Sequence, residues 1–405
     1  MFAYIVVLLL TCLLAEITQR ISEKDNKKII ILLSLLVILV PSAFAGLRDT
    51  KIGTDVELYV TPSFYYATQS KSLGEYFETS KEETLYTIMN FVVSRFTNDV
   101  HWLLFIIQLI MTSLVYVTIY KQRKKMPMWL GMMVYMILFY TRFLNLIRQG
   151  IAVCIVVFAF NFIEDKKPIK YFASIIIAML FHRTAVVALL LYFINILLNK
   201  EDKKSKKIML GIYILVIASI FFYDIILNIL LNINILPNKF ELYLTKYKKE
   251  SFDPEIFYTL FKLIWVIWTI LLYKNIKKND TGVKFKVSLL LFDIIFLQYS
   301  TRILNAERIS YYFGTIGEIL LIPQIPLANN SAFIKQLLEK IEKEFKINIT
   351  NKMPNKLTKI IDNDKIIKMI TTIIIIILLI LYFYWYYIKY SAGEIYPYKS
   401  NILGI

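Results

Sequence analysis

The stretch KIIILLSLLVILVPSAFAG, residues 28–46, decides the fold class of this chain. Only its first residue is charged, and about 20 apolar residues in a helix are enough to cross the hydrocarbon core of a bilayer. Similar apolar blocks recur along the chain, and each predicts a helix. The expected helices lie near residues 2–18, 28–46, 100–120, 127–142, 148–163, 169–181, 184–199, 207–227, 254–273, 284–301, 308–325 and 367–388. The sequence therefore predicts an all-α, polytopic integral membrane protein with about 12 transmembrane helices.

Composition excludes the main alternatives to a helical membrane protein. Of the 405 residues, 58% are hydrophobic and 19% are charged, against about 45–50% and about 25% in soluble chains. These values exclude a soluble enzyme, a disordered chain and a secreted domain held by disulfides. An outer-membrane barrel is also excluded, because its strands alternate in segments of about 10 residues. Cys12 and Cys154 both lie inside apolar blocks, so they indicate neither a disulfide framework nor a metal site.

The positive charge of the chain indicates its orientation in a membrane. The net charge is +17, and the basic residues cluster in short loops between alternate apolar blocks. Cytoplasmic loops of membrane proteins carry such an excess of lysine and arginine, so the charge requires no nucleic-acid partner. With twelve spans, both termini and the long loop 47–99 face outward, while the lysine-rich segment 327–366 is cytoplasmic. The exception is the outward loop 228–253, which also contains four lysines.

Two further segments complete the organisation of the chain, which we interpret as one transmembrane domain, residues 1–405. No basic residue precedes the apolar run 2–18, so this run predicts an uncleaved first helix and not a removable signal. Residues 332–346 place apolar side chains at helical spacing, with lysines on the other faces. That pattern predicts a helix on the inner leaflet, and a solvated connector helix is the equal alternative.

Polar residues that the basic loops do not explain gather in four clusters on the predicted outer side. Ionisable groups at membrane depth cost several kcal/mol, so each is a candidate for a functional role. Taken singly, each cluster has a structural explanation: a solvated loop, an arginine reaching the interface, or a neutral histidine bonded inside the bundle. Each contains arginine, and their convergence from distant parts of the chain is the informative signal. The clusters lie at residues 46–59, 141–149, 182–183 and 301–312.

The arginines of these clusters predict an anion site. Arg148, Arg302 and Arg308 can clamp a pyrophosphate, because a guanidinium binds phosphate bidentately and stays charged. The sequence has no phosphate-binding glycine loop, no His-x-x-x-His pair and no acidic run suited to a divalent cation, so we expect neither cofactor nor metal. A lipid-linked pyrophosphate fits this pattern, with its tail in the bilayer and its charged head at the outer surface.

Six short motifs, taken in order along the chain, resemble elements of a known family. They are GLRDTKIGTDVELY (46–59), ETLY (83–86), NLIRQGIA (145–152), FHRTA (181–185), RISYYF (308–313) and YPY (396–398). Together they resemble the EpsG family of Wzy-type polysaccharide polymerases over nearly the whole chain. Arg183 departs from the family pattern, which usually has a small polar residue at that place.

The resemblance implies a reaction, a location and partners. A growing glycan on undecaprenyl pyrophosphate would be transferred onto a new lipid-linked repeat unit at the outer face of the bacterial cytoplasmic (inner) membrane. The product would be an exopolysaccharide, capsule or O-antigen, and no metal or other cofactor is then required. The partners would be undecaprenyl-pyrophosphate-linked repeat units and membrane lipids, with a chain-length regulator as an optional addition.

On this hypothesis each candidate residue has a role. The catalytic candidates are Asp55 or His182 as general base, together with Arg148, which stabilises the departing pyrophosphate. The remaining candidates bind or position the substrate. The full substrate-binding set is Arg48, Asn145, Arg148, Gln149, Arg302, Asn305, Arg308 and Tyr312. Tyrosines can also offer flat faces to sugar rings, and the candidates for that are Tyr59, Tyr65, Tyr66, Tyr311 and Tyr312.

Three alternative functions stay open at this point. A flippase for the same lipid-linked unit would also use basic groups in a cavity, but it predicts polar residues at mid-depth and on both sides. An O-antigen ligase differs in its acceptor, which the sequence does not show. A membrane acyltransferase would have an Arg/His pair in the first span, and residues 2–18 contain neither.

Overall fold

The computed structural model describes residues 1–24, 26–200, 202–233, 238–249, 255–328, 330–345, 361 and 363–405. Within these ranges the chain is helical, with one isolated β-bridge between Lys248 and Ile303 and no longer strand pairing. The α-helices of the first half are α1 (Phe2–Ser22), α2 (Lys27–Gly46), α3 (Thr61–Gln69), α4 (Leu73–Thr79), α5 (Thr84–Ser94), α6 (Val100–Lys121), α7 (Met128–Val134), α8 (Thr141–Phe143), α9 (Ile147–Glu164) and α10 (Pro168–Phe181). Those of the second half are α11 (Leu189–Asn199), α12 (Lys203–Phe221), α13 (Tyr223–Asn232), α14 (Ile256–Leu271), α15 (Tyr273–Asn279), α16 (Val283–Leu297), α17 (Tyr311–Leu321), α18 (Asn330–Phe345) and α20 (Asp364–Phe383).

Short 3₁₀ and π helices connect or extend these α-helices. They are η1 (Val56–Val60), η2 (Tyr135–Tyr140), η3 (Arg183–Ala188), η4 (Asn238–Tyr243), η5 (Gln298–Thr301), η6 (Ala306–Ile309), η7 (Ile322–Leu327), η9 (Tyr384–Lys389) and η10 (Ala392–Glu394). The expected loop 47–99 consists largely of η1 and α3 to α5. These elements are tied together by Arg95, whose guanidinium donates to the carbonyls of Ala67 (2.5 Å) and Ser70 (3.0 Å).

The predicted fold class is confirmed, because the described parts of the twelve apolar segments form helices, some of them interrupted. Five described helices are long and apolar enough to cross a membrane: α1, α2, α6, α9 and the continuous segment Asp364–Lys389. The count rises to seven if two bent pairs are each one span: α12 with α13, bent by 90°, and α14 with α15, bent by 71°. The other expected spans form shorter or interrupted helices, so five to seven of the expected twelve meet this length criterion.

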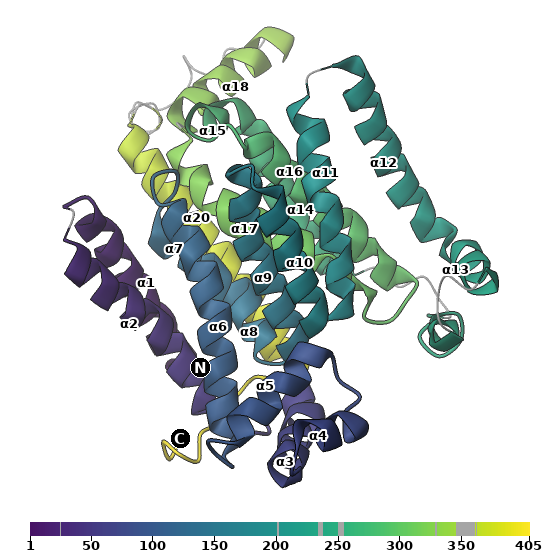
Figure 1. Cartoon of the computed structure of the whole chain (residues 1–405). Coiled ribbons are helices and arrows are strands. Elements are labelled where there is room, and N and C mark those ends of the chain that lie inside the picture. The colour runs from purple at the N-terminus through teal and green to yellow at the C-terminus, as the bar shows by residue number, and fades with distance from the viewer. Residues whose placement is uncertain are drawn as a thin grey trace.

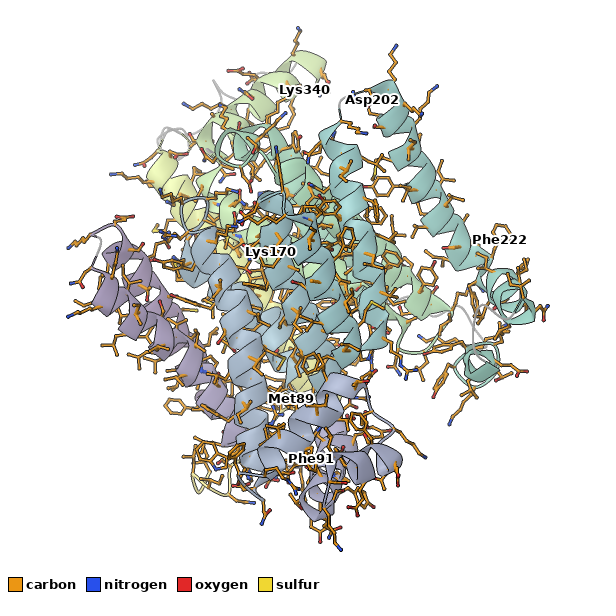
Figure 2. The ribbon with its side chains drawn as sticks, in the orientation of Figure 1. Met89, Phe91, Lys170, Asp202, Phe222 and Lys340 are labelled. Atoms are coloured by element: carbon orange, nitrogen blue, oxygen red, sulfur yellow. The ribbon has the colours of Figure 1, made fainter. Side chains whose placement is uncertain are left out.

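The helices form one elongated bundle with two distinct ends (Figure 1). Both termini and α3 to α5 gather at one end, here called the termini end, whereas α15 and α18 lie at the opposite, basic end. Figure 2 shows Lys340 and Asp202 at the basic end, and Met89 and Phe91 at the termini end. This is the alternation that the spacing of the lysine-rich loops predicts.

Two sequence expectations fall partly outside the described residues. The amphipathic helix expected at 332–346 is present as α18, although residue 346 itself is not described. Within the expected cytoplasmic segment 327–366, residues 346–360 also lie outside the described part.

An ionic cluster lies in the interior of the bundle, where α14, α16 and α17 meet. Lys262 contacts Asp293 and lies 3.1 Å from Glu318, and all three side chains are at most 3% exposed. A methyl group on Gly314 would lie 2.5 Å from the Asp293 carboxylate, so glycine is what lets α17 approach α16 this closely. We call Lys262, Asp293 and Glu318 the sealed ionic cluster.

Candidate functional site

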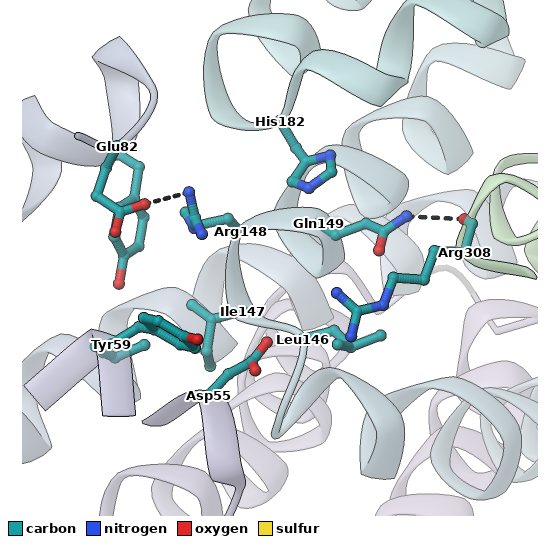
Figure 3. Close-up of a pocket in the computed structure, with 11 residues that line it drawn as sticks. Asp55, Tyr59, Glu82, Leu146, Ile147, Arg148, Gln149, His182 and Arg308 are labelled. Carbon is teal, nitrogen blue, oxygen red and sulfur yellow. Dashed lines mark hydrogen bonds and ion pairs between the residues drawn. The ribbon is translucent and has the colours of Figure 1, made fainter. Parts of the chain in front are cut away.

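A small charged pocket at the termini end brings together side chains from distant parts of the chain (Figure 3). Its volume is about 40 Å³. It lies where η1, the start of α5, the start of α9, the α10–η3 break and η6 meet. The described lining residues are Asp55, Tyr59, Val60, Glu82, Tyr86, Leu146, Ile147, Arg148, Gln149, His182 and Arg308.

Asp55 reaches the pocket because a turn before it is fixed from two sides. Gly53 adopts φ +94°, a conformation that suits glycine, and its N–H donates to the Glu394 carbonyl of the C-terminal segment (3.2 Å). The Asn145 side-chain oxygen accepts from the Asp55 N–H (2.7 Å) and from the Thr54 hydroxyl (3.3 Å). Asn145 therefore positions Asp55 from behind and is not itself among the residues that line the pocket.

The Asp55 carboxylate points into the pocket (Figure 3). Burial raises its pKa above the usual value, and the nearby charges of Arg308 and Arg148 partly oppose that rise. Partial desolvation makes this carboxylate a stronger base than an exposed aspartate, although the two cations limit the gain.

Arg148, in the first turn of α9, is paired with two carboxylates. Its Nη1 contacts Glu82 and lies 2.7 Å from Glu83, both of which come directly before α5. Burial also raises the pKa of Glu82, with Arg148 opposing the rise. The sequence motif included Glu83, but Glu82 was missed as a site residue. The adjacent acidic pair Glu82-Glu83 was the available signal, and nothing in the spacing showed that it would meet an arginine 65 residues later.

Arg308, on η6, contributes a cation that is not compensated in the same way. Its backbone carbonyl accepts a hydrogen bond from the Gln149 side chain (2.8 Å), which fixes the turn that carries it. Among the described residues no carboxylate forms an ion pair with its guanidinium. The Arg308 guanidinium lies on the opposite side of the pocket from Arg148 (Figure 3). An anion in the pocket would therefore have a guanidinium group on each side.

His182 ends α10 and is held by a short hydrogen-bond relay. Its Nδ1 and the Thr184 hydroxyl share a hydrogen bond of 2.6 Å, and Thr184 in turn bonds the Tyr312 hydroxyl (2.9 Å). Burial lowers the pKa of His182 to about 4, so the imidazole is neutral at physiological pH. Tyr312 is fully buried and does not line the pocket. It was expected to bind substrate, but its contacts with the site run through Thr184 and Gln149.

Arg48, another expected substrate-binding residue, lies away from the pocket lining. Its side chain is 1% exposed and sits in the electrostatic neighbourhood of Tyr140, Tyr4 and Tyr398. The phenolic hydroxyls of Tyr4 and Tyr398 donate to the carbonyls of Ile395 and Phe44. Arg48 thus lies beneath the C-terminal tail, in the packing between α1, α2 and that tail.

Arg302 is also absent from the described lining, so the expected clamp of three arginines is reduced to two. Its backbone carbonyl accepts from the Lys249 N–H (2.9 Å), and its charge acts on Tyr223 and Asp224. The turn between η5 and η6 separates it from Arg308, because Asn305 adopts a left-handed conformation (φ 61°) and reverses the chain.

A second, larger cavity adjoins the charged pocket. His182 and Arg308 line both, and Asn305 lines only the second, whose volume is about 540 Å³. Its walls are mostly apolar and aromatic. The tyrosines among them are Tyr223, Tyr243, Tyr247 and Tyr299. Of the tyrosines expected to face sugars, Tyr311 and Tyr312 are buried, whereas Tyr59, Tyr65 and Tyr66 are exposed.

In the described ranges, no group of three or more His, Cys, Asp or Glu side chains is arranged to hold a metal ion. The comparisons with known proteins give one match. The model of the EpsG family matches residues 31–337. No curated protein and no solved structure matches the chain.

Proposed function

The chain belongs to the EpsG family, whose members are Wzy-like polysaccharide polymerases, and from this premise we propose that it polymerises glycan repeat units carried on a lipid pyrophosphate. One observation carries the proposal. A single pocket joins two arginines, a partly desolvated carboxylate and a neutral histidine, drawn from four separate parts of the chain. These are the groups that glycosyl transfer from a pyrophosphate donor needs.

The proposed step transfers the growing glycan. A hydroxyl oxygen of the acceptor sugar attacks the anomeric carbon of the donor, and the bond from that carbon to the pyrophosphate oxygen breaks. The electron pair leaves with the lipid pyrophosphate, and the hydroxyl proton passes to the general base. Arg308 and Arg148 stabilise the charge that develops on the departing pyrophosphate, which is commonly the largest contribution to catalysis.

Asp55 and His182 are the two candidates for the base. Asp55 is charged above its raised pKa and faces the pocket, whereas His182 is neutral and can accept a proton once its other nitrogen is held by Thr184. We favour Asp55, because its carboxylate points into the pocket, whereas the Nδ1 of His182 is already engaged by the Thr184 hydroxyl. Glu82 and Glu83 hold Arg148 in the absence of that anion.

The cavity of about 540 Å³ that adjoins the charged pocket suits the prenyl tail. A pyrophosphate at Arg308 lies at the boundary between the charged pocket and this mostly apolar space, so the tail can extend into it. We further propose that the termini end faces the cell exterior and that the membrane is the bacterial cytoplasmic membrane. Support comes from the lysine-rich loops, which cluster at the opposite end as the positive-inside rule requires.

A flippase is the second candidate, and one observation favours it. The sealed ionic cluster places charged groups in the interior of the bundle, as an alternating-access pathway would require. Against a pathway, its three side chains are at most 3% exposed and contact one another.

The test is the glycan made by a deletion strain that carries plasmid-borne variants. If the deleted gene encodes a polymerase, the strain accumulates single repeat units on the acceptor lipid. If it encodes a flippase, the strain has no surface glycan. We expect Asp55→Asn and Arg308→Gln to give single units and the exposed control Lys207→Met to restore full-length polymer. Full-length polymer from both pocket variants, with equal expression, would overturn the assignment of the pocket.

A further inference from the structure

Two further cavities, distinct from the charged pocket and from the cavity of about 540 Å³ beside it, follow the same three helical elements. The first is at the basic end, has a volume of about 610 Å³, and lies between the C-terminal part of α1, the start of α7 and the start of α20. The second has a volume of about 330 Å³ and lies between the N-terminal part of α1, the η2 region and the later turns of α20. Neither contains a residue of the charged pocket.

The two cavities follow one another along these elements with short gaps between their linings, and we call the two together the groove. On α7, the first cavity ends at Leu130 and the second begins at Met133. On α20, the first ends at Thr372 and the second begins at Ile376. On α1, the lining passes from Glu16 to Leu9. At 1.5 Å per helical residue, these gaps correspond to about 5–10 Å. We call the part at the basic end the mouth and the other part the bore.

The mouth is charged. Its described lining contains four basic side chains, Arg20, Arg123, Lys124 and Lys368, against two acidic ones, Glu16 and Glu23. Glu16 is paired with Arg20 (2.7 Å), which leaves an excess of positive charge facing the cavity. An anionic group is the complement of this mouth.

The bore is apolar. None of the described side chains that line it carries a charge, and most are Met, Ile, Leu, Val or Phe. Near the termini end, the Tyr4 ring packs against Phe44 (centroids 5.1 Å apart) and Phe383 (5.7 Å), and all three rings line the bore. A ligand in the bore must therefore present an apolar chain that needs no hydrogen bonds.

We infer that the groove binds one anionic phospholipid, with its headgroup at the mouth and an acyl chain in the bore. A soluble anion would use only the mouth, and a neutral lipid would leave the excess positive charge unmatched. Basic pockets between transmembrane helices are known to bind anionic headgroups. The bound lipid would join α1 to α7 and α20 and would contact none of the residues that line the charged pocket, so the inference does not depend on the proposed polymerase activity.

The experiment uses the full chain reconstituted in nanodiscs of phosphatidylglycerol and phosphatidylcholine, extracted into detergent and analysed by native mass spectrometry. We expect one retained phosphatidylglycerol per chain. The double variant Lys124→Glu/Lys368→Glu should lower its occupancy at least tenfold. The matched control Lys203→Glu/Lys204→Glu changes two exposed lysines at the same end, outside the mouth, and should retain it.

A second pair of variants tests the bore without changing charge. Ile380→Trp enlarges a side chain that lines the bore, whereas Ile377→Trp changes an equally exposed residue on the same helix that does not line it. We expect only Ile380→Trp to reduce retention. Equal loss from both lysine pairs, equal retention of phosphatidylcholine, or no effect of Ile380→Trp would each overturn the inference.

Discussion

The charged pocket and the sealed ionic cluster both gather ionisable side chains from distant helices, yet they differ in how those charges are matched. In the cluster, Lys262 contacts Asp293 and Glu318, and none of the three is more than 3% exposed. In the pocket, Arg148 is 32% exposed beside its two glutamates, and no described carboxylate pairs with Arg308. One set of charges is closed on itself, and the other is open to a ligand.

That difference separates a structural role from a chemical one. Removing one member of a buried ion pair leaves an unpaired charge, which costs more than the pair contributes, so such a cluster constrains the fold. An arginine with unused donors facing a cavity can instead bind an anion that arrives later. Charge at membrane depth is therefore a weak guide to function until its partners are known.

The largest expected effect is on the sealed cluster. Lys262→Met leaves Asp293 and Glu318 buried without their cation, and we expect the free energy of unfolding to fall by about 3–5 kcal/mol. The measurement is reversible denaturation in detergent, with Lys207→Met as an exposed control. Adding Asp293→Asn and Glu318→Gln should recover much of the loss, because no net charge is then buried. If Lys262→Met unfolded like the control, the cluster would not be structural.

The next effect concerns Arg302 and Arg308, the two arginines of the cluster at residues 301–312. Arg308→Gln removes a guanidinium group that lines the pocket. We expect the polymerisation rate to fall about 10²–10³-fold, with little change in stability. Arg302→Gln, which lies outside the described lining, should stay within about threefold. The rate is measured in membranes supplied with lipid-linked repeat units. A greater loss from Arg302→Gln would restore the clamp expected from the sequence.

The third effect concerns the base. Burial raises the pKa of Asp55, so its basic form appears at higher pH than that of an exposed aspartate. Because the reaction needs that form, the rate should rise with pH through the raised pKa, and Asp55→Asn should remove this limb with a loss of about 10²-fold. The measurement is kcat/KM against pH. A limb that survives in Asp55→Asn and vanishes in His182→Gln would assign the base to His182.

The sequence predicted the helices well, because long apolar runs are a local property. It also predicted that Asp55, Arg148, Gln149, His182 and Arg308 would lie on one side, which the pocket confirms in space without testing their roles. Five other expected residues do not line the pocket, and the places of two of them depended on long-range packing. Arg48 is covered by a tail more than 300 residues later, and Tyr312 lies behind Thr184. Arg302 is separated from Arg308 by the turn at Asn305.

The smallest expected effect tests the relay behind His182. Tyr312→Phe removes the hydroxyl that bonds Thr184, yet leaves the bond between Thr184 and His182. A neutral hydrogen bond contributes about 0.5–1.5 kcal/mol, so we expect the rate to fall about 2- to 10-fold. Thr184→Val breaks both bonds and should cost more than Tyr312→Phe, with a shift in the pH at which His182 titrates by NMR. If Tyr312→Phe cost more than Thr184→Val, the tyrosine hydroxyl would act through its other partner, Gln149, or on the substrate, and the relay would not explain its place beside the pocket.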